Sequence, residues 1–298
     1  MRLGLALPQF GAHSGADQIT SFARTGEQLG YGSLWVADRV LAPVAPSDLY
    51  PVGGTPQRPY PPEFRSSLDP VVVLAAAAAA TTTARLASST INAPWHDALL
   101  LARSLTSLDR LCGGRLDVGF GLGWLRDEYI ATGTPWQHRG SRLEEILDVL
   151  HELWTHNPAE YHGRHFELPL AHVDLRPVQA GGPPVLLGGW SPAAMTRIGR
   201  RAAGWLPVHG IPVDVTAALW QIGRHAAEKA GRDPDLLRRE LRINLQPGQD
   251  ARHAVDALAQ ARDAGVDGAF LDLQYVTSSV DESLSIAADV IAKVGALD

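Results

Sequence analysis

The sequence predicts an α/β fold in which eight parallel strands close into a (β/α)8 TIM barrel. Short apolar segments alternate with amphipathic helical segments eight times along the chain, a pattern typical of parallel strands joined by helices. The length of 298 residues accommodates one such barrel. An open, doubly wound sheet is the alternative. Its dinucleotide fingerprint is missing, however, because Trp124 stands where Gly119 and Gly121 would require a third glycine.

The composition is that of an ordinary globular protein, with 45% hydrophobic and 19% charged residues. A formal net charge of −6 argues against a nucleic-acid or anionic-membrane partner. Cys112 is the only cysteine, so no intramolecular disulfide can form. The sequence opens without a secretory signal pattern and has no apolar run of bilayer length. We therefore expect residues 1–298 to form a single soluble, cytoplasmic domain.

Apolar runs and helix-end signals define the first three strand–helix units. Strands are expected over residues 3–7, 33–37 and 84–92. The first helix has one apolar face and ends at Gly30. Asp69 and Pro70 start an alanine-rich second helix, which we interpret as a surface for close helix–helix packing. Asp97 caps the third helix, whose buried stripe is predicted to be Leu101, Leu105, Leu108 and Leu111.

Residues 41–66 interrupt this pattern. They contain seven prolines together with Tyr50, Tyr60 and Phe64, so no regular helix or strand is expected there. A loop of this length in a compact protein is usually functional. We interpret the proline-rich loop as a lid over a binding site, with a static surface arm as the alternative.

A glycine-rich segment from Gly113 to Trp124 forms the fourth strand. Its apolar residues predict a strand buried on both faces, and glycines then occupy alternate positions at 119, 121 and 123. Glycines at a strand end let a flat ligand approach the backbone, but a tight turn of the barrel would need them equally. Both interpretations remain open from this segment alone.

The second half of the chain resumes the repeat after an insertion. Ser141 and Glu144 have the spacing of a capping box for the fourth helix. Residues 155–183 carry β-prone, aromatic segments around a polar turn, which predict an inserted hairpin. Strands are then expected over residues 184–188, 205–208, 241–245 and 268–273. Their helices are expected over residues 191–204, 214–230, 254–265 and 284–294.

In a TIM barrel, function is expected where the carboxyl ends of the strands meet. These ends carry few carboxylates and no Ser–His or Cys–His pair, so hydrolysis by side chains is poorly supported. Their small residues leave room for a flat cofactor. The segment from Gly188 to Ser191 leads into a helix N-terminus, a feature that binds phosphate, although an ordinary capped helix would have the same sequence.

Charged and titratable residues near the other strand ends have simpler interpretations. Asp38 and Arg39 end the second strand, where a structural ion pair is the alternative to a functional role. His96 and Asp97 are interpreted as a loop residue and a helix cap. The histidines between residues 138 and 172 lack the spacing of metal ligands, so no metal site is expected.

Six segments form a combined pattern that is more specific than any one of them. They are Ser33-Leu34-Trp35-Val36-Ala37-Asp38, Leu105-Thr106-Ser107-Leu108-Asp109-Arg110-Leu111-x-Gly113-Gly114-Arg115, Gly119-x-Gly121-x-Gly123-Trp124, Arg139-Gly140-x-Arg142 with Glu144-Glu145, Pro184-x-Leu186-Leu187-Gly188-Gly189, and Gly204-Trp205-Leu206-Pro207. Over nearly its whole length, the chain resembles the luciferase-like monooxygenase superfamily. Within it, the chain is most similar to the branch of oxidoreductases that depend on the deazaflavin F420.

This resemblance implies a TIM barrel that forms a homodimer and binds F420 or FMN at its mouth. The cofactor would be held by Asp38, Ser89, Thr90, Asn92, Gly121 and Gly123 at the ring, and by Gly188, Gly189, Trp190 and Ser191 at the phosphate. Related enzymes carry a non-proline cis peptide on the third strand, which would fall between Ser89 and Thr90. Asp38 and Arg39 would stand at the catalytic position. The expected substrate pocket consists of Phe10, Tyr50, Phe64, Trp124 and His209.

The chain departs from the family pattern at two places. Arg39 follows Asp38 where the F420 branch usually has a histidine, and arginine cannot exchange protons near neutral pH. His96-Asp97-Ala98 replaces the usual Arg-His-Pro before the third helix. We expect hydride transfer between F420 and a small organic substrate. An FMN-dependent monooxygenase is the alternative, and a non-catalytic flavin-binding or deazaflavin-binding protein is a third possibility.

Overall fold

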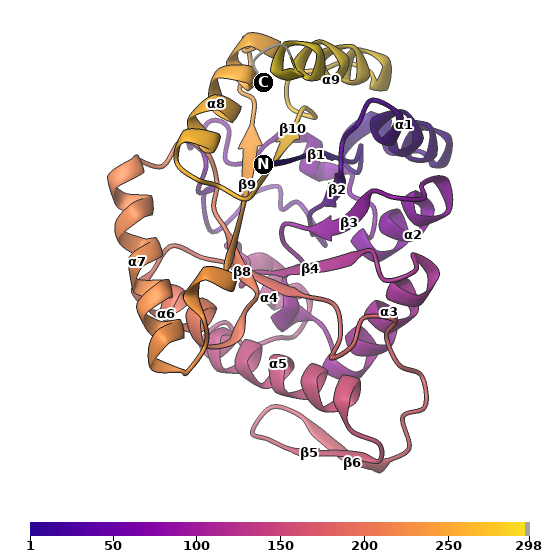
Figure 1. The fold of residues 1–298 in the computed structure, drawn as a ribbon, viewed down its shortest axis with the longest axis vertical. Helices are drawn as coiled ribbons and strands as arrows, with labels where there is room; N and C mark the ends of the chain where they lie inside the picture. Colours follow the sequence, from indigo (N-terminus) through magenta and orange to yellow (C-terminus); the bar gives the residue numbers. More distant parts are fainter. Residues whose placement is uncertain (296–298) are drawn as a thin grey trace.

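The computed structural model describes residues 1–295, and its centre is a closed barrel of eight parallel strands, as the sequence predicts (Figure 1). Around the barrel the strands follow the order β1-β10-β9-β8-β7-β4-β3-β2, and β2 pairs with β1. The barrel strands are β1 (Arg2–Ala6), β2 (Ser33–Val36), β3 (Arg85–Ser88), β4 (Leu116–Phe120), β7 (Val185–Gly188), β8 (Gly204–Leu206), β9 (Arg238–Asn244) and β10 (Gly268–Asp272). Because all neighbours are parallel, the carboxyl ends of the strands meet at one opening.

Helices surround the barrel (Figure 1), and all of them except α4 bury apolar residues in its main hydrophobic core. They are α1 (Ala16–Gln28), α2 (Pro70–Ala80), α3 (Ala98–Leu111), α4 (Arg126–Ala131), α5 (Arg139–Thr155), α6 (Pro192–Arg201), α7 (Val213–Lys229), α8 (Ala251–Asp263) and α9 (Val280–Gly295). Asp69 and Asp97 cap α2 and α3 through their side chains, as their positions in the sequence predict.

An antiparallel hairpin is inserted between α5 and β7, as predicted. It consists of β5 (Ala159–His162) and β6 (Glu167–Ala171), and it lies along the outer side of α5 (Figure 1). Glu145 of α5 holds its turn, since the carboxylate accepts hydrogen bonds from the backbone N–H groups of Arg164, His165 and Phe166. The hairpin is therefore an appendage of α5 and adds nothing to the barrel wall.

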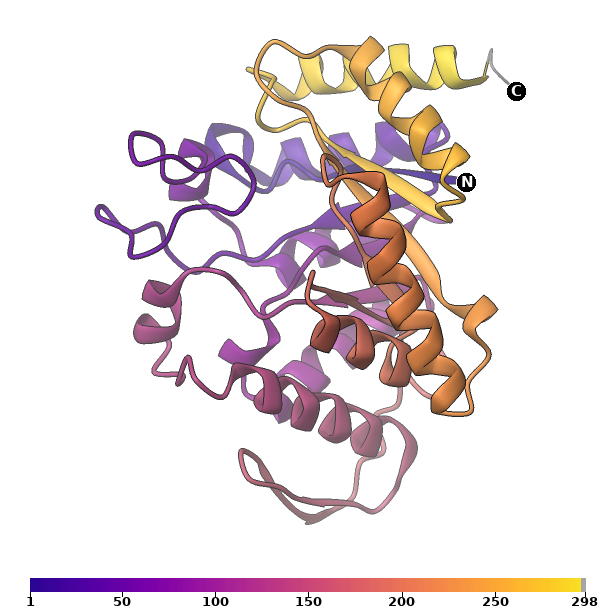
Figure 2. The ribbon, with the colours of Figure 1, turned by 90° about the vertical axis from the view of Figure 1, so that its left-hand side faces the viewer.

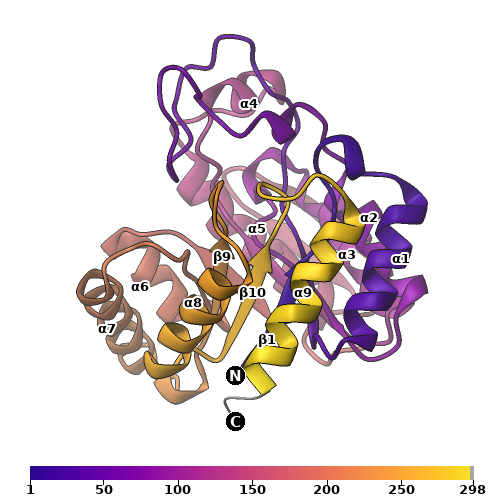
Figure 3. The same cartoon turned by 90° about the horizontal axis from the view of Figure 1, so that it is seen from above.

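The proline-rich loop and α4 project on the same side of the barrel, away from the N-terminus (Figure 2, Figure 3). One short 3-10 turn, Pro62–Arg65, is the regular element within residues 41–66. Phe10, Tyr60 and Phe64 form a buried aromatic cluster that holds the loop against the barrel. Tyr50 and Trp124 pack against this cluster.

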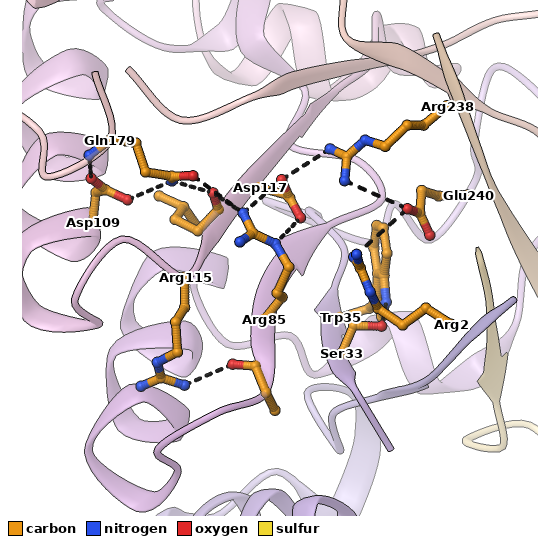
Figure 4. A network of polar contacts seen from close by, with 12 residues as sticks. Arg2, Ser33, Trp35, Arg85, Asp109, Arg115, Asp117, Gln179, Arg238 and Glu240 are labelled. Atoms are coloured by element: carbon orange, nitrogen blue, oxygen red, sulfur yellow. Dashed lines mark hydrogen bonds and ion pairs between the residues drawn. The ribbon is translucent and has the colours of Figure 1, made fainter. Parts of the chain in front are cut away.

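The opposite end of the barrel is closed by a network of charged side chains (Figure 4). Asp117 of β4 accepts from Arg85 of β3 at 2.6 Å and from Arg238 of β9 at 3.0 Å. Glu240 lies 3.8 Å from Arg238 and 3.9 Å from Arg2. Asp117 and Glu240 are both buried, so these arginines compensate charges that water cannot reach.

Three details differ from the sequence predictions. Ser141 and Glu144 do not form a capping box, because α5 begins at Arg139 and both residues lie inside the helix. Glu144 instead pairs with Arg197 and Arg201 of α6. Leu111, predicted to be buried, is 73% exposed because α3 ends there and the chain turns away. The short helix α4 was not predicted, since six residues are too few to show a helical period.

Candidate active site

A cavity of about 470 Å³ opens at the carboxyl ends of β2, β3, β4 and β7, and we call it the mouth cavity. The loop after β1 and the proline-rich loop complete its wall. Every site residue predicted from the sequence except one contributes to the lining. These residues are Phe10, Asp38, Arg39, Tyr50, Phe64, Ser89, Thr90, Asn92, Gly121, Gly123, Trp124, Gly188, Gly189, Trp190 and Ser191.

His209 is the exception. It follows β8, its backbone N–H donates to the carbonyl of Arg242, and its residue is exposed. The neighbouring Val208 lines the cavity in its place. A shift of one residue on an extended segment turns the side chain to the other face, which a sequence pattern of this length cannot resolve.

Asp38 is the buried carboxylate at the end of β2, with 4% of its surface exposed. Its Oδ2 accepts from the backbone N–H of Asn92 at 3.0 Å and lies 3.2 Å from Nε2 of His96. The side chain of His96 is 30% exposed. His96, interpreted from the sequence as a loop residue, therefore connects solvent to a carboxylate on the cavity wall.

Arg142 of α5 fixes the turn that carries His96. Its guanidinium donates to the carbonyl of Pro94 at 2.9 Å and to that of His96 at 3.4 Å. Arg142 belongs to one of the six segments that define the family pattern. Its contacts give that segment a role in positioning the backbone beside Asp38.

Arg39 does not pair with the side chain of Asp38. Its Nε donates to the Asp38 carbonyl at 2.8 Å, and its Nη1 lies 2.8 Å from Oε2 of Glu128 in α4. The ion pair of Asp38 and Arg39 considered from the sequence is thus replaced by a pair with Glu128. Burial raises the pKa of Glu128 to about 7 despite the neighbouring charge of Arg39, and burial lowers the pKa of Arg39.

Gly119 within β4 and Gly121 just after it are required by the neighbouring segment of β3 and the residues that follow it. A Cβ on Gly119 would lie 1.8 Å from the carbonyl oxygen of Ser88, and one on Gly121 would lie 2.3 Å from Oγ1 of Thr90. The peptide bond between Ser89 and Thr90 is cis, as the family resemblance implies. Packing in the barrel therefore requires glycine at positions 119 and 121, as the interpretation of a tight barrel turn holds. Gly121 also lines the cavity, as the interpretation of a ligand site holds.

The segment from Gly188 to Ser191 leads from β7 into α6. Ser191 is the N-cap, and its hydroxyl accepts from the backbone N–H of Ala194 at 3.2 Å. Gly189 has φ of 140°, a left-handed conformation that favours glycine. This wall of the cavity therefore offers backbone N–H groups and the positive end of the α6 dipole.

Two further arginines line the mouth cavity and were not predicted as site residues. Arg242 of β9 donates to the Ser89 carbonyl at 2.9 Å and pairs with Asp272 at 2.5 Å. Arg139 stacks on Trp136, with 3.8 Å between its guanidinium carbon and the ring centre. The alternation of β9 gives a weak signal for Arg242, since it stands between the buried Leu241 and Ile243.

Residues 1–295 hold neither a metal-binding cluster nor a membrane-spanning helix. That part of the chain contains no cluster of three or more His, Cys, Asp or Glu side chains arranged for a metal ion. His162 pairs with Glu160 and Glu167 on the exposed hairpin. None of the described helices is both long and apolar enough to cross a bilayer.

The family model for luciferase-like monooxygenases matches residues 1–289. The chain belongs to this family. It is therefore an oxidoreductase, and the cavity at the barrel mouth is its candidate active site.

Two curated relatives illustrate the range of the family. An uncharacterised protein of Mycobacterium tuberculosis is 33% identical over 200 residues, which cover 67% of this chain and 71% of that protein. The FMNH2-dependent dimethylsulfone monooxygenase of Pseudomonas putida is 30% identical over 133 residues, which cover 44% of this chain and 36% of that enzyme.

Two solved structures share the fold. A monooxygenase from Streptomyces bottropensis superposes with a TM-score of 0.80 at 21% identity, over 98% of this chain and 99% of that one. The coenzyme F420-dependent tetrahydromethanopterin reductase of Methanopyrus kandleri gives a TM-score of 0.74 at 16% identity, over 98% and 99%. At these identities the likeness establishes the barrel architecture.

Proposed function

We propose that this chain is an F420-dependent oxidoreductase that transfers a hydride between the deazaflavin and a small organic substrate. The lining of the mouth cavity carries the proposal, because it joins bare backbone, a helix N-terminus and an aromatic wall in one space. The described lining holds no Ser–His or Cys–His pair that would supply a nucleophile. An F420-dependent reductase built on the same barrel supports this choice.

The residues present fit a phosphorylated tricyclic cofactor. The N–H groups that open α6, around Ser191, would bind the phosphate. Thr90, Asn92 and Gly121 line the cavity and would lie against the ring. When bound, F420 supplies hydride chemistry that no protein side chain can perform. The protein supplies position, exclusion of water and a proton.

We assign the supply of the proton that accompanies hydride transfer to His96, which would deliver it through Asp38. Reduction of an organic acceptor by a hydride also consumes one proton, and Arg39 cannot release one near neutral pH. His96 is the histidine in contact with a cavity-lining carboxylate among the described residues, at 3.2 Å from Asp38. His96→Gln is expected to lower turnover and alter its pH profile, while cofactor affinity stays unchanged.

An FMN-dependent monooxygenase is the second candidate. It is favoured by the FMNH2-dependent relative from Pseudomonas putida and by the monooxygenase that shares the fold. Both tricyclic rings need similar walls, so the same lining serves either. A non-catalytic cofactor-binding protein is a third candidate, prompted by Arg39 in place of the usual proton carrier.

Two measurements separate these candidates. Purified protein that quenches F420 fluorescence at low concentration and ignores FMN supports the first candidate, and the reverse result replaces it with the second. Stopped-flow reoxidation of the bound, reduced cofactor against a panel of enones and imines then tests catalysis. If a cofactor binds but no acceptor accelerates its reoxidation, the protein is a binding protein.

The homodimer implied by the family resemblance remains a prediction. Four large apolar side chains on α2 and α3 are exposed and would be available to a second copy: Val72, Leu99, Leu100 and Leu111. Light scattering coupled to size-exclusion chromatography measures the mass directly. A monomeric mass at micromolar concentration contradicts the prediction.

A further inference from the structure

Arg39 is a buried guanidinium with most of its donors unused. Its side chain lies on the wall of the mouth cavity and is only 8% exposed. A guanidinium has five N–H donors. Among the described residues, one of them finds an acceptor, the Asp38 carbonyl at 2.8 Å from Nε. Nη1 is buried and donates no hydrogen bond.

Glu128 balances the charge of Arg39 without occupying its donors. Oε2 of Glu128 is 2.8 Å from Nη1, yet neither atom is oriented for a hydrogen bond. The other carboxylate oxygen, Oε1, accepts from the backbone N–H of Val40 at 3.1 Å. A forked, bidentate pair would align both oxygens with the guanidinium, and this pair does not.

Arg242 on the same cavity shows the opposite arrangement. Its Nε donates to Asn244, its Nη1 to Ser89, and its Nη2 to Asp272 and Tyr275. All three nitrogens of Arg242 are therefore committed to the protein. Arg139, the third arginine of the lining, also has a buried Nε without a partner, but it is partly exposed and its Nη1 donates to the Trp136 carbonyl. Arg39 differs from both because its side chain is buried and most of its donors remain available for a ligand.

Aromatic rings hold the guanidinium of Arg39 in place. Its central carbon lies 5.7 Å from the ring centres of Phe64 and Trp95 and 5.1 Å from that of Trp124. Such contacts favour a cation and exclude water from it. Tyr50, Val52 and Leu122 add apolar surface to the same cavity.

We propose that Arg39 binds the carboxylate of an organic acid, so that the substrate is an apolar molecule bearing one carboxylate. A planar guanidinium with adjacent free donors matches the two oxygens of a carboxylate. The apolar cavity wall would take the body of the acid. What happens to the acid rests on the proposed function, whereas its binding does not.

The charge of Glu128 controls this site. Above pH 7 its carboxylate offsets Arg39, and below pH 7 it takes up a proton, since burial raises its pKa to about 7. Anion binding is thus expected to strengthen as the pH falls from 8 to 6. The other titratable groups that face the pair are Asp38, Tyr50, Tyr129 and Tyr275, and His96 lies behind Asp38.

The experiment compares cyclohexanecarboxylate with its neutral isostere, cyclohexanecarboxamide. Both are titrated into the cofactor-free protein and into protein loaded with F420 or FMN, by calorimetry and by tryptophan fluorescence, to which Trp95 and Trp124 beside Arg39 contribute. The carboxylate is expected to bind at least about tenfold more tightly than the amide. Arg39→Met abolishes that preference, and Arg65→Met, which removes an exposed charge beside Phe64, preserves it.

Two variants keep the test decisive. Arg39→Lys keeps the positive charge but loses the planar fork of donors, so it is expected to retain only part of the preference for the carboxylate. This variant tests the proposal if Arg39→Met fails to fold. Glu128→Gln removes the pH dependence between 6 and 8, and His96→Gln leaves it in place. Equal affinity for the two probes overturns the proposal. So does an Arg39→Met variant that weakens cofactor binding but not carboxylate binding. If the protein binds the carboxylate but binds neither F420 nor FMN, this inference stands and the proposed function is wrong.

Discussion

The two ends of the barrel treat buried charge in opposite ways. At the closed end, Asp117 receives Arg85 and Arg238 together, and every charge shown in Figure 4 has a partner. At the mouth, Arg39 sits beside Glu128 with most of its donors unused. Both ends bury charged groups, namely Asp117 and Glu240 at the closed end and Arg39 and Glu128 at the mouth. Burial by itself therefore does not distinguish structure from function.

The difference lies in whether the hydrogen bonds of the charged groups are satisfied. A buried charge whose donors and acceptors are all used stabilises one arrangement of the strands and leaves nothing for a ligand. A buried charge with free donors costs stability and persists where a ligand completes it. The same reasoning assigns stability to the closed end of a TIM barrel and chemistry to its mouth.

Asp117→Asn is the largest expected disturbance. It leaves Arg85 and Arg238 without their shared carboxylate, and breaking a buried pair of this kind costs about 3–5 kcal/mol. Urea unfolding measures the loss. Asp127→Asn is the matched control, because Asp127 contacts the exposed Ser47 and its loss is expected to cost less than about 1 kcal/mol. Similar losses for the two variants would contradict the contrast between the ends.

Ser191→Asp tests the mouth without disturbing the fold. Aspartate and asparagine both cap helices as well as serine does, so α6 stays intact in either variant. The aspartate places a negative charge where the cofactor phosphate is proposed, and cofactor affinity is expected to fall roughly 30-fold or more. Ser191→Asn is the neutral control in the same fluorescence titration. Equal affinities would place the phosphate elsewhere.

Gly121→Ala separates packing from ligand binding at one residue. The added Cβ would meet Oγ1 of Thr90 at 2.3 Å, and overpacking of this kind costs about 1–3 kcal/mol. Thr90→Ala in the same chain removes that oxygen and should restore most of the stability in thermal unfolding. If the double variant is stable yet binds no cofactor, Gly121 serves the ligand as well. If stability stays low, the clash is with the backbone instead.

The pH dependence of stability is the most gradual expected effect, because it is spread over a wide range of pH. Burial raises the pKa of Glu128 to about 7, so between about pH 4.5 and 7 the folded protein retains a proton that the unfolded chain has lost. Glu128 therefore makes stability fall as the pH rises through this window, by up to about 3 kcal/mol in total. Glu128→Gln should flatten this part of the curve from urea unfolding at several pH values. An unchanged slope would mean that another group titrates.

Most of the site was predictable because barrel topology brings strand ends together wherever they stand in the sequence. Asp38, Asn92, Gly121 and Ser191 each follow an apolar strand, so their meeting at one cavity follows from the fold. His96 and Arg242 were missed for different reasons. His96 belongs to a turn whose direction is set by Arg142. Arg242 lies within a parallel barrel strand, which is covered on both faces, so apolar residues are expected there.

The order of strands and helices, the hairpin and the glycine-rich ends were fixed locally, because hydrophobic period and helix caps act over a few residues. The partners of the charges were decided only by the folded structure. Arg39 meets Glu128, which comes from a distant part of the chain, and the backbone N–H of the adjacent Val40 donates to the same carboxylate. No pattern in the sequence specifies such a pairing, since it depends on where α4 settles over the barrel mouth. Which donors stay free for a ligand is therefore a property of tertiary packing.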